Sequence, residues 1–155
     1  ERGNAAALAA AYSCSTDVEG DVRIGAVKTV GRLAERGDRC AIDHLIKELH
    51  NESDNPIKYQ ALTSLASIVE RGDKSAVKAV CAQLSNREWF VRLEALKTLA
   101  QIASARDKAT KMQIQKLLQD REFDVRSEAE LTMAQIYQNE NGSKERSRRP
   151  VRCCF

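Results

Sequence analysis

The sequence predicts an all-α fold, an α-solenoid (superhelix) of about four stacked helix pairs. Its clearest sign is a four-residue phrase that recurs in steps of 34, 35 and 34 residues, at Glu1–Asn4, Glu35–Asp38, Glu70–Asp73 and, in degenerate form, Ser104–Asp107. Self-similarity at a period of this size is typical of helical repeat arrays. Only two of the 155 residues are proline and 5% are aromatic, so we expect a core of Ala, Leu, Ile and Val.

Each repeat unit predicts a pair of helices, and a flexible basic tail, residues 139–155, is expected to follow the array, residues 1–138. The array divides into units 1–34, 35–69, 70–103 and 104–137. The first helix of a unit begins just after the recurring phrase and places apolar residues three and four positions apart, which predicts one buried face. In units two and three this stripe is Ala41, Ile42, Leu45, Ile46 and Leu49, and then Ala76, Val77, Val80, Cys81 and Leu84.

A column of polar residues marks the turn inside each unit, at Asp17, Asn51, Asn86 and Asp120. The second unit carries one extra residue in this turn. The second helix then opens with a Val-Arg-like pair: Val22-Arg23, Ile57-Lys58, Val91-Arg92 and Val125-Arg126. A small residue follows at Ala26, Ala61, Ala95 and Ala129, where it permits close helix packing. We interpret the cationic column as structural, pairing with the polar turn residues of successive units; the alternative is a ladder that holds an acidic partner.

The recurring phrase itself has a structural interpretation. We expect Gly37 and Gly72 to end one helix in the left-handed conformation at the C′ position. Asp38 and Asp73 are then placed to cap the next helix by accepting backbone N–H bonds.

The segments from Asn86 to Ala95 and from Asp120 to Ala129 show a polar turn residue followed by Val-Arg-x-x-Ala. This grammar resembles the HEAT-like, armadillo-type helical repeat, in the short form found in phycobilisome lyases, and the resemblance covers roughly residues 1–138. It implies a protein-binding solenoid whose second helices line the concave surface.

Three polar columns on the second helices are expected to face outward and form a groove for a protein partner. They run through Gly25, Thr29, Arg32 and Ser67, and their candidate binding residues are Gln60, Ser64, Glu94, Thr98, Gln101, Glu128, Thr132 and Gln135. Trp89 and Phe123 share one further column at the head of the second helix. They form either a binding hot spot or a hydrophobic wedge between units.

No catalytic, cofactor-binding or metal-binding set is predicted. The HEAT-like enzyme deoxyhypusine hydroxylase binds iron through His-Glu pairs, but Leu93-Glu94 and Ser127-Glu128 stand at the matching positions here. His44 and His50 lie six residues apart, on different faces of one helix. We therefore expect a protein that is not an enzyme and needs no cofactor.

The net charge of +3 resides in the predicted tail, so the repeat body is neutral and binding to nucleic acid is not expected. Five cysteines, two of them (Cys40 and Cys81) in apolar stripes, favour a reducing, cytoplasmic location inside the cell. Cys153 and Cys154 resemble the double-prenylation ending of Rab-type GTPases and are candidate lipidation sites, the one route by which we expect membrane binding.

Two features concern the ends of the array. The chain starts at the junction phrase, so we expect a further repeat upstream of Glu1. Glu130 replaces an apolar column residue, which predicts that the array ends near Tyr137.

Together these features predict a non-catalytic protein-binding scaffold, or a structural subunit of a larger assembly. Two alternatives stay open: a HEAT-like bilin lyase or chaperone-type assembly factor, and an adaptor tethered to a membrane through a lipidated Cys-Cys tail.

Overall fold

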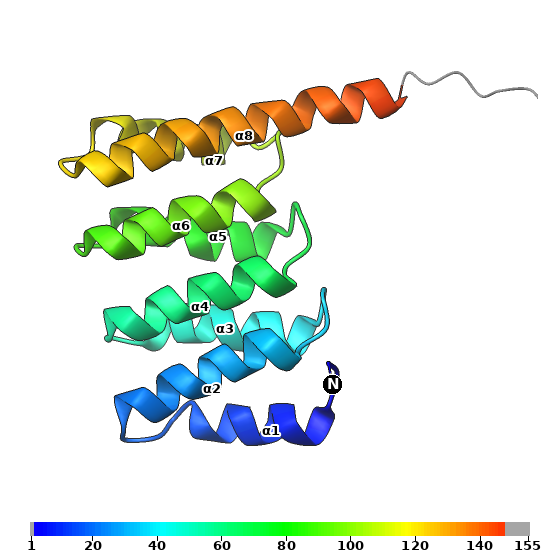
Figure 1. Cartoon of the computed structure of the whole chain (residues 1–155), viewed down its shortest axis with the longest axis vertical. Coiled ribbons are helices and arrows are strands. Elements are labelled where there is room, and N and C mark those ends of the chain that lie inside the picture. The colour runs from blue at the N-terminus through cyan, green and yellow to red at the C-terminus, as the bar shows by residue number, and fades with distance from the viewer. Residues whose placement is uncertain (1, 148–155) are drawn as a thin grey trace, which may run out of the picture.

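The computed structural model describes residues 2–147, with side chains through residue 138, and shows the predicted all-α architecture (Figure 1). No strand occurs among these residues. The helices are α1 (Ala5–Cys14), α2 (Gly20–Leu33), α3 (Arg39–Asn51), α4 (Asn55–Ile68), α5 (Lys74–Ala82), α6 (Trp89–Ile102), α7 (Lys108–Lys116) and α8 (Phe123–Ser147). Short 3-10 turns extend α5 and α7, at Gln83–Ser85 and Leu117–Gln119.

The helices form two layers (Figure 1). The second helices α2, α4, α6 and α8 stack directly on one another in front, and the first helices α1, α3, α5 and α7 lie behind them. Each pair contacts mainly its neighbours along the stack, which is the construction of a solenoid. We refer to the exposed side of α2, α4, α6 and α8 as the second-helix face.

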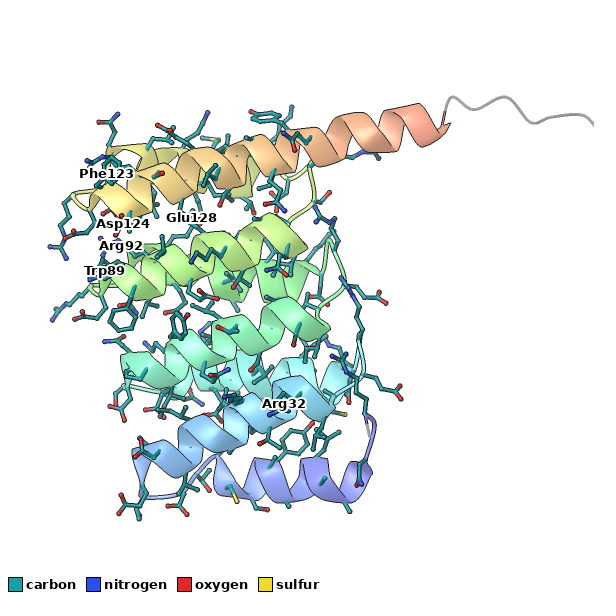
Figure 2. The ribbon with its side chains drawn as sticks, viewed as in Figure 1. Arg32, Trp89, Arg92, Phe123, Asp124 and Glu128 are labelled. Carbon is teal, nitrogen blue, oxygen red and sulfur yellow. The ribbon has the colours of Figure 1, made fainter. Side chains whose placement is uncertain are left out.

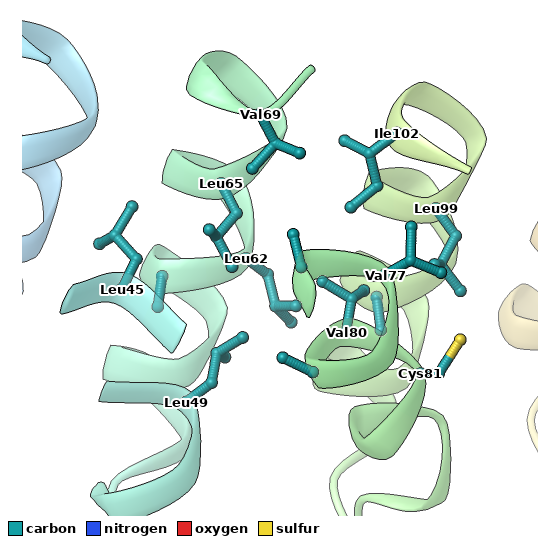
Figure 3. Close-up of a cluster of buried hydrophobic side chains, with 14 of the residues drawn as sticks. Leu45, Leu49, Leu62, Leu65, Val69, Val77, Val80, Cys81, Leu99 and Ile102 are labelled. Atoms are coloured by element: carbon teal, nitrogen blue, oxygen red, sulfur yellow. The ribbon is translucent and has the colours of Figure 1, made fainter. Parts of the chain in front are cut away.

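The core lies between the two layers and continues from unit to unit. Figure 3 shows part of it, where Leu45 and Leu49 of α3 lie near Leu62 and Leu65 of α4. The stripes predicted for α3 and α5 are buried, apart from the half-buried Ile46. Cys81 is buried as predicted, whereas the expectation that Cys40 lies in the apolar stripe is wrong: it is exposed.

The glycines of the recurring phrase are left-handed, as predicted, but they do not sit at a helix C′ position. Gly37 has φ +84° and Gly72 has φ +90°. Each is the third residue of a β-turn, closed in the first case by a bond from the Asp38 N–H to the Glu35 carbonyl. The aspartates cap the next helix as expected, and Asp38 accepts from the Ala41 N–H at 3.1 Å.

These glycines also join neighbouring units through the backbone. The N–H of Gly3 donates to the Leu33 carbonyl, that of Gly37 to Ile68 and that of Gly72 to Ile102, each at 2.7 Å. The acceptors lie near the C-termini of α2, α4 and α6, where a helix leaves carbonyls without an intrahelical partner. The turn of one unit therefore satisfies a helix end in the next.

The fourth junction lacks this bond. Arg106 stands where the glycine would be, and its N–H donates locally to Ser104 Oγ at 3.3 Å. The corresponding acceptor, Ile136, lies in the interior of α8, which continues as a helix to Ser147. The helix is thus longer than predicted, because the tail was expected to begin at residue 139. Residues 148–155 lie outside the described residues.

The extra residue of the second unit lies in the first helix of that unit, before the turn. Here α3 is an α-helix as far as Asn51, whereas the matching segments of units three and four end in 3-10 turns. A 3-10 turn rises about 2.0 Å per residue against about 1.5 Å in an α-helix, so it covers the same length with fewer residues. As a result Glu52, and not the predicted Asn51, occupies the polar turn position and binds the N–H groups of Ser53 and Asp54.

His44 lies between the first two units, against the ring of Tyr12 at 4.6 Å between centroids. Its Nε2 has no hydrogen-bond partner among the described residues, and the nearest carboxylate oxygen, on Glu48, is 3.8 Å away. Burial, followed by the charge of Lys47, lowers the pKa of His44 below 6.5. The fold therefore favours the neutral imidazole.

This burial predicts a pH-dependent stability. The unfolded chain gains the His44 proton at a higher pH than the folded chain, so the free energy of unfolding should fall as the pH drops below about 6.5. Burial raises the pKa of Glu48, which opposes this trend at lower pH, so the window to measure runs from about pH 7.5 to 5.5. Urea unfolding of His44→Phe should give a flatter profile, whereas His50→Gln should keep the wild-type slope. Equal slopes for wild type and His44→Phe would contradict this account.

Candidate protein-binding face

One of the three polar columns does not face outward, which corrects the sequence-based expectation. Ser64, Thr98 and Thr132 are buried between successive second helices. Their hydroxyls lie 3.1 to 3.3 Å from helix carbonyl oxygens of the preceding unit, those of Val27, Leu62 and Leu96. A helix carbonyl has a second lone pair free for such a bond. The small hydroxyl side chains therefore join adjacent helices and are not available to a partner.

The glutamate column is more enclosed than the sequence suggests. Glu94 is 8% exposed and accepts a hydrogen bond from Thr63 Oγ1 at 3.0 Å. Glu128 is half-buried, and its pKa is raised by burial and by the charge of Glu94, against the lowering effects of Lys97 and Thr132. The charge of Glu94 on α6 therefore acts on Glu128 on α8.

The remaining candidates lie on the surface. Gln101 and Gln135 are exposed and Gln60 is half-buried. Trp89 is 41% and Phe123 71% exposed, and both lie along the same side of the stack, at the start of α6 and α8 (Figure 2). They differ in their surroundings: Trp89 packs edge-on to Phe90 at 6.2 Å, whereas the guanidinium of Arg126 lies 5.7 Å from the Phe123 ring.

Two further aromatic residues, which the sequence analysis missed, extend the surface around Trp89. The ring of Tyr59 on α4 lies 6.4 Å from that of Phe90 on α6, and Tyr59 is 40% exposed. Tyr59, Phe90 and Trp89 therefore form a continuous group, the aromatic row, across two neighbouring second helices. The column Ile24, Tyr59, Leu93 and Ser127 is apolar in three units, and that signal could have revealed it.

The structural interpretation of the cationic column is confirmed for Arg23 and Arg92. Arg92 donates to both carboxylate oxygens of Asp120 at 2.7 Å, and its side chain is 6% exposed. Arg23 also pairs with the following turn, through one contact each to Glu52 and to the more exposed Asp54. In the last unit Arg126 binds only the carbonyls of its own turn, at Asp120 and Arg121.

The Arg92 contact also changes the ionisation of its partner. Burial alone would raise the pKa of Asp120, but the hydrogen bond from Arg92, the Glu122 N–H bond and the charges of Arg92 and Arg121 lower it overall. Asp120 is therefore held in its charged form in the folded protein.

The other predicted residues bear on function in different ways. His44 and His50 do not meet, since the first is half-buried against Tyr12 and the second is exposed. In the described part of the chain no helix has the length and apolar character needed to cross a membrane. Cys153 and Cys154, the candidate lipidation sites, lie outside the described residues.

In a comparison with protein families, a model of HEAT repeats matches residues 42–134. The stacked helical hairpins described above agree with this match. The chain belongs to the HEAT-repeat family. No curated protein matches its sequence. HEAT repeats generally act as scaffolds for interactions between proteins. The HEAT assignment therefore establishes the fold and a general type of role, while leaving the partner to be inferred from the surface.

Proposed function

We propose that this protein is a non-catalytic scaffold or assembly subunit that binds a protein partner through its second-helix face. The observation that carries the proposal is the aromatic row across α4 and α6, in which Tyr59 and Trp89 are exposed and the half-buried Phe90 joins them to the core. Aromatic residues that are large, rigid and partly exposed are the residues in which binding energy is most often concentrated.

The surroundings of the aromatic row favour recognition of a macromolecule. Its rings stand on α4 and α6, whose inner sides are packed into the continuous core. Such support holds the rings in place before a partner arrives, which reduces the entropy lost on binding. Gln60, Gln101 and Gln135 supply polar groups on the same layer of helices, and Phe123 adds an apolar group at the α8 end.

The proposal places the protein inside the cell, where exposed thiols such as those of Cys14 and Cys40 stay reduced. The bilin-handling and membrane-tethered alternatives stay predictions, because neither the described residues nor the family match bears on them.

Affinity purification of the full chain from its source, with quantitative mass spectrometry, tests this function. The wild type should recover a defined partner, and the double variant Tyr59→Ala/Trp89→Ala should recover at least about tenfold less, as expected for the loss of two hot-spot residues. Met112→Ala on α7 is the matched control, because Met112 is also an exposed apolar residue (64%) but lies on the first-helix layer.

Circular dichroism should show that all three proteins are equally folded. Recovery of the same partner by the double variant would exclude the aromatic row as the binding site. A wild-type protein that is isolated only as a free monomer would contradict the scaffold role.

A further inference from the structure

A hollow opens between α2 and α4, and one of its lining residues, Gln60, directly follows Tyr59 of the aromatic row in the sequence. It has a volume of about 340 Å³, and a neighbouring hollow of about 430 Å³ shares two of its lining residues, Arg2 and Arg32. The first hollow is lined by Arg2, Lys28, Gly31, Arg32, Gln60, Thr63, Ser64 and Ser67. Volumes of this size are in the range of ligand pockets, so the hollow can hold several side chains of a partner.

Small residues line this hollow where α2 and α4 meet. A Cβ added to Gly31 would lie 2.6 Å from the Cβ of Ser64, so the two helices approach each other as closely as their backbones allow. The Ser67 hydroxyl lies 2.7 Å from the Ser64 carbonyl and 3.1 Å from the Gly31 carbonyl, and it leaves little side chain above Gly31. At the junction of α4 and α6, Ala66 stands at the position of Gly31 and Gln101 at the position of Ser67. The shape is therefore a local feature of α2 and α4.

The residues that line the hollow carry positive charge. It is lined by three cations, Arg2, Lys28 and Arg32, and by no aspartate or glutamate. None of the three forms an ion pair within the described part of the chain, in contrast to Arg23 and Arg92. Cations gathered in this way repel one another unless an anion lies between them. A carboxylate placed there would also form strong, charge-assisted hydrogen bonds with the two guanidinium groups.

The other end of the second-helix face has the opposite charge. Besides Arg23, which is paired with Glu52 and Asp54, α2 carries the cations Lys28 and Arg32 against one acid, whereas α8 through residue 138 carries three acids, Asp124, Glu128 and Glu130, against the one cation Arg126. Figure 2 shows Arg32 on α2, and Asp124 and Glu128 on α8, at opposite ends of the stack. A uniform polyanion such as nucleic acid would meet repulsion at α8. A protein segment whose acidic residues are confined to one end fits both regions.

We propose that the hollow binds the carboxylate side chains of an acidic segment of the protein partner, and that the adjoining part of this segment lies over the aromatic row. The inference deepens the proposed function and rests on it. It also fixes the direction of the partner, whose acidic end lies on α2 and α4. Tyr59, next to Gln60 on α4, is placed to receive the first apolar side chain beyond the carboxylates.

Selection of a random twelve-residue peptide library on the full chain tests this proposal without knowledge of the partner. Enriched peptides should contain at least two acidic residues followed by an apolar one. Their dissociation constants are then measured by fluorescence anisotropy at low ionic strength. Lys28→Glu/Arg32→Glu should weaken binding at least tenfold. Lys108→Glu/Lys116→Glu on α7 makes the same change in net charge at two exposed lysines and should weaken binding less than twofold.

Three outcomes would overturn the proposal: no enrichment of acidic peptides, equal weakening by the two double variants, or displacement of the peptide by inorganic phosphate at an equal concentration, which would mark a phosphate site instead. The proposed function is tested separately. If Tyr59→Ala/Trp89→Ala abolishes peptide or partner binding while Lys28→Glu/Arg32→Glu does not, the aromatic row stands as the binding site and only the acidic contact is wrong.

Discussion

Arg92→Ala is expected to lower the free energy of unfolding by about 3 kcal/mol, because it breaks a buried ion pair and leaves its partner charged. The side chains of Arg92 and Asp120 are only 6% and 10% exposed, and both carboxylate oxygens of Asp120 accept from the guanidinium. The same side chain binds the carbonyls of Asn86 and Arg87. Urea unfolding followed by circular dichroism measures the loss.

Arg126→Ala is the matched control, since Arg126 occupies the same column and makes no ion pair within the described residues; it donates to two carbonyls and lies over the Phe123 ring. It should cost about 1 kcal/mol. Because the pKa of Asp120 is lowered in the folded protein, the contribution of the pair is present above about pH 4 and is lost as the pH falls through the folded pKa. Equal losses for the two variants would show that the contact between units adds nothing.

Gly31→Val should also destabilise the protein by about 3 kcal/mol, through overpacking. The new Cβ would lie 2.6 Å from the Cβ of Ser64 and 2.9 Å from its Cα, so the backbones of α2 and α4 must separate. The buried bond from Ser64 Oγ to the Val27 carbonyl would be strained at the same time.

Gly25 on the same helix provides a control, because a substitution there should raise the free energy of unfolding and not lower it. A Cβ added there meets nothing within 4 Å. Gly25→Ala should therefore stabilise the protein by about 0.5–1 kcal/mol, because alanine loses less conformational entropy than glycine when a helix forms. Thermal unfolding of both variants gives the comparison. Stabilisation by Gly31→Val would mean that α2 and α4 are not in close contact.

Much of the fold could be predicted because each unit repeats the same local solution. The apolar spacing of α3 and α5 is enough to define their buried faces. Asp38 and Asp73 cap these helices because an aspartate directly before a helix accepts hydrogen bonds from its first N–H groups. These features depend on neighbours within about four residues. Because the repeat occurs several times in one chain, the same apolar spacing and the same helix caps can be compared between its copies.

The candidate site was less predictable, because exposure on the second helices depends on contacts between units. The helical pattern places Thr98 on the surface, yet the adjacent helix covers it, and its hydroxyl lies between the Leu62 carbonyl of that helix and the Glu94 carbonyl of its own. Tyr59 and Phe90 are 31 positions apart and become neighbours only after the units stack. The hollow beside Gly31 likewise results from the distance between two helices, which no local pattern specifies.

Hydrogen exchange of the turn glycine amides tests the central claim, that the four hairpins form one stack in register. Gly37 and Gly72 lie in exposed turns, but their N–H groups donate across units at 2.7 Å. The Arg106 amide, at the same position of the fourth turn, makes only a local 3.3 Å bond. We expect Gly37 and Gly72 to exchange at least about a hundredfold more slowly than Arg106. Exchange of all three amides at the rate of an open turn would contradict the stacked arrangement.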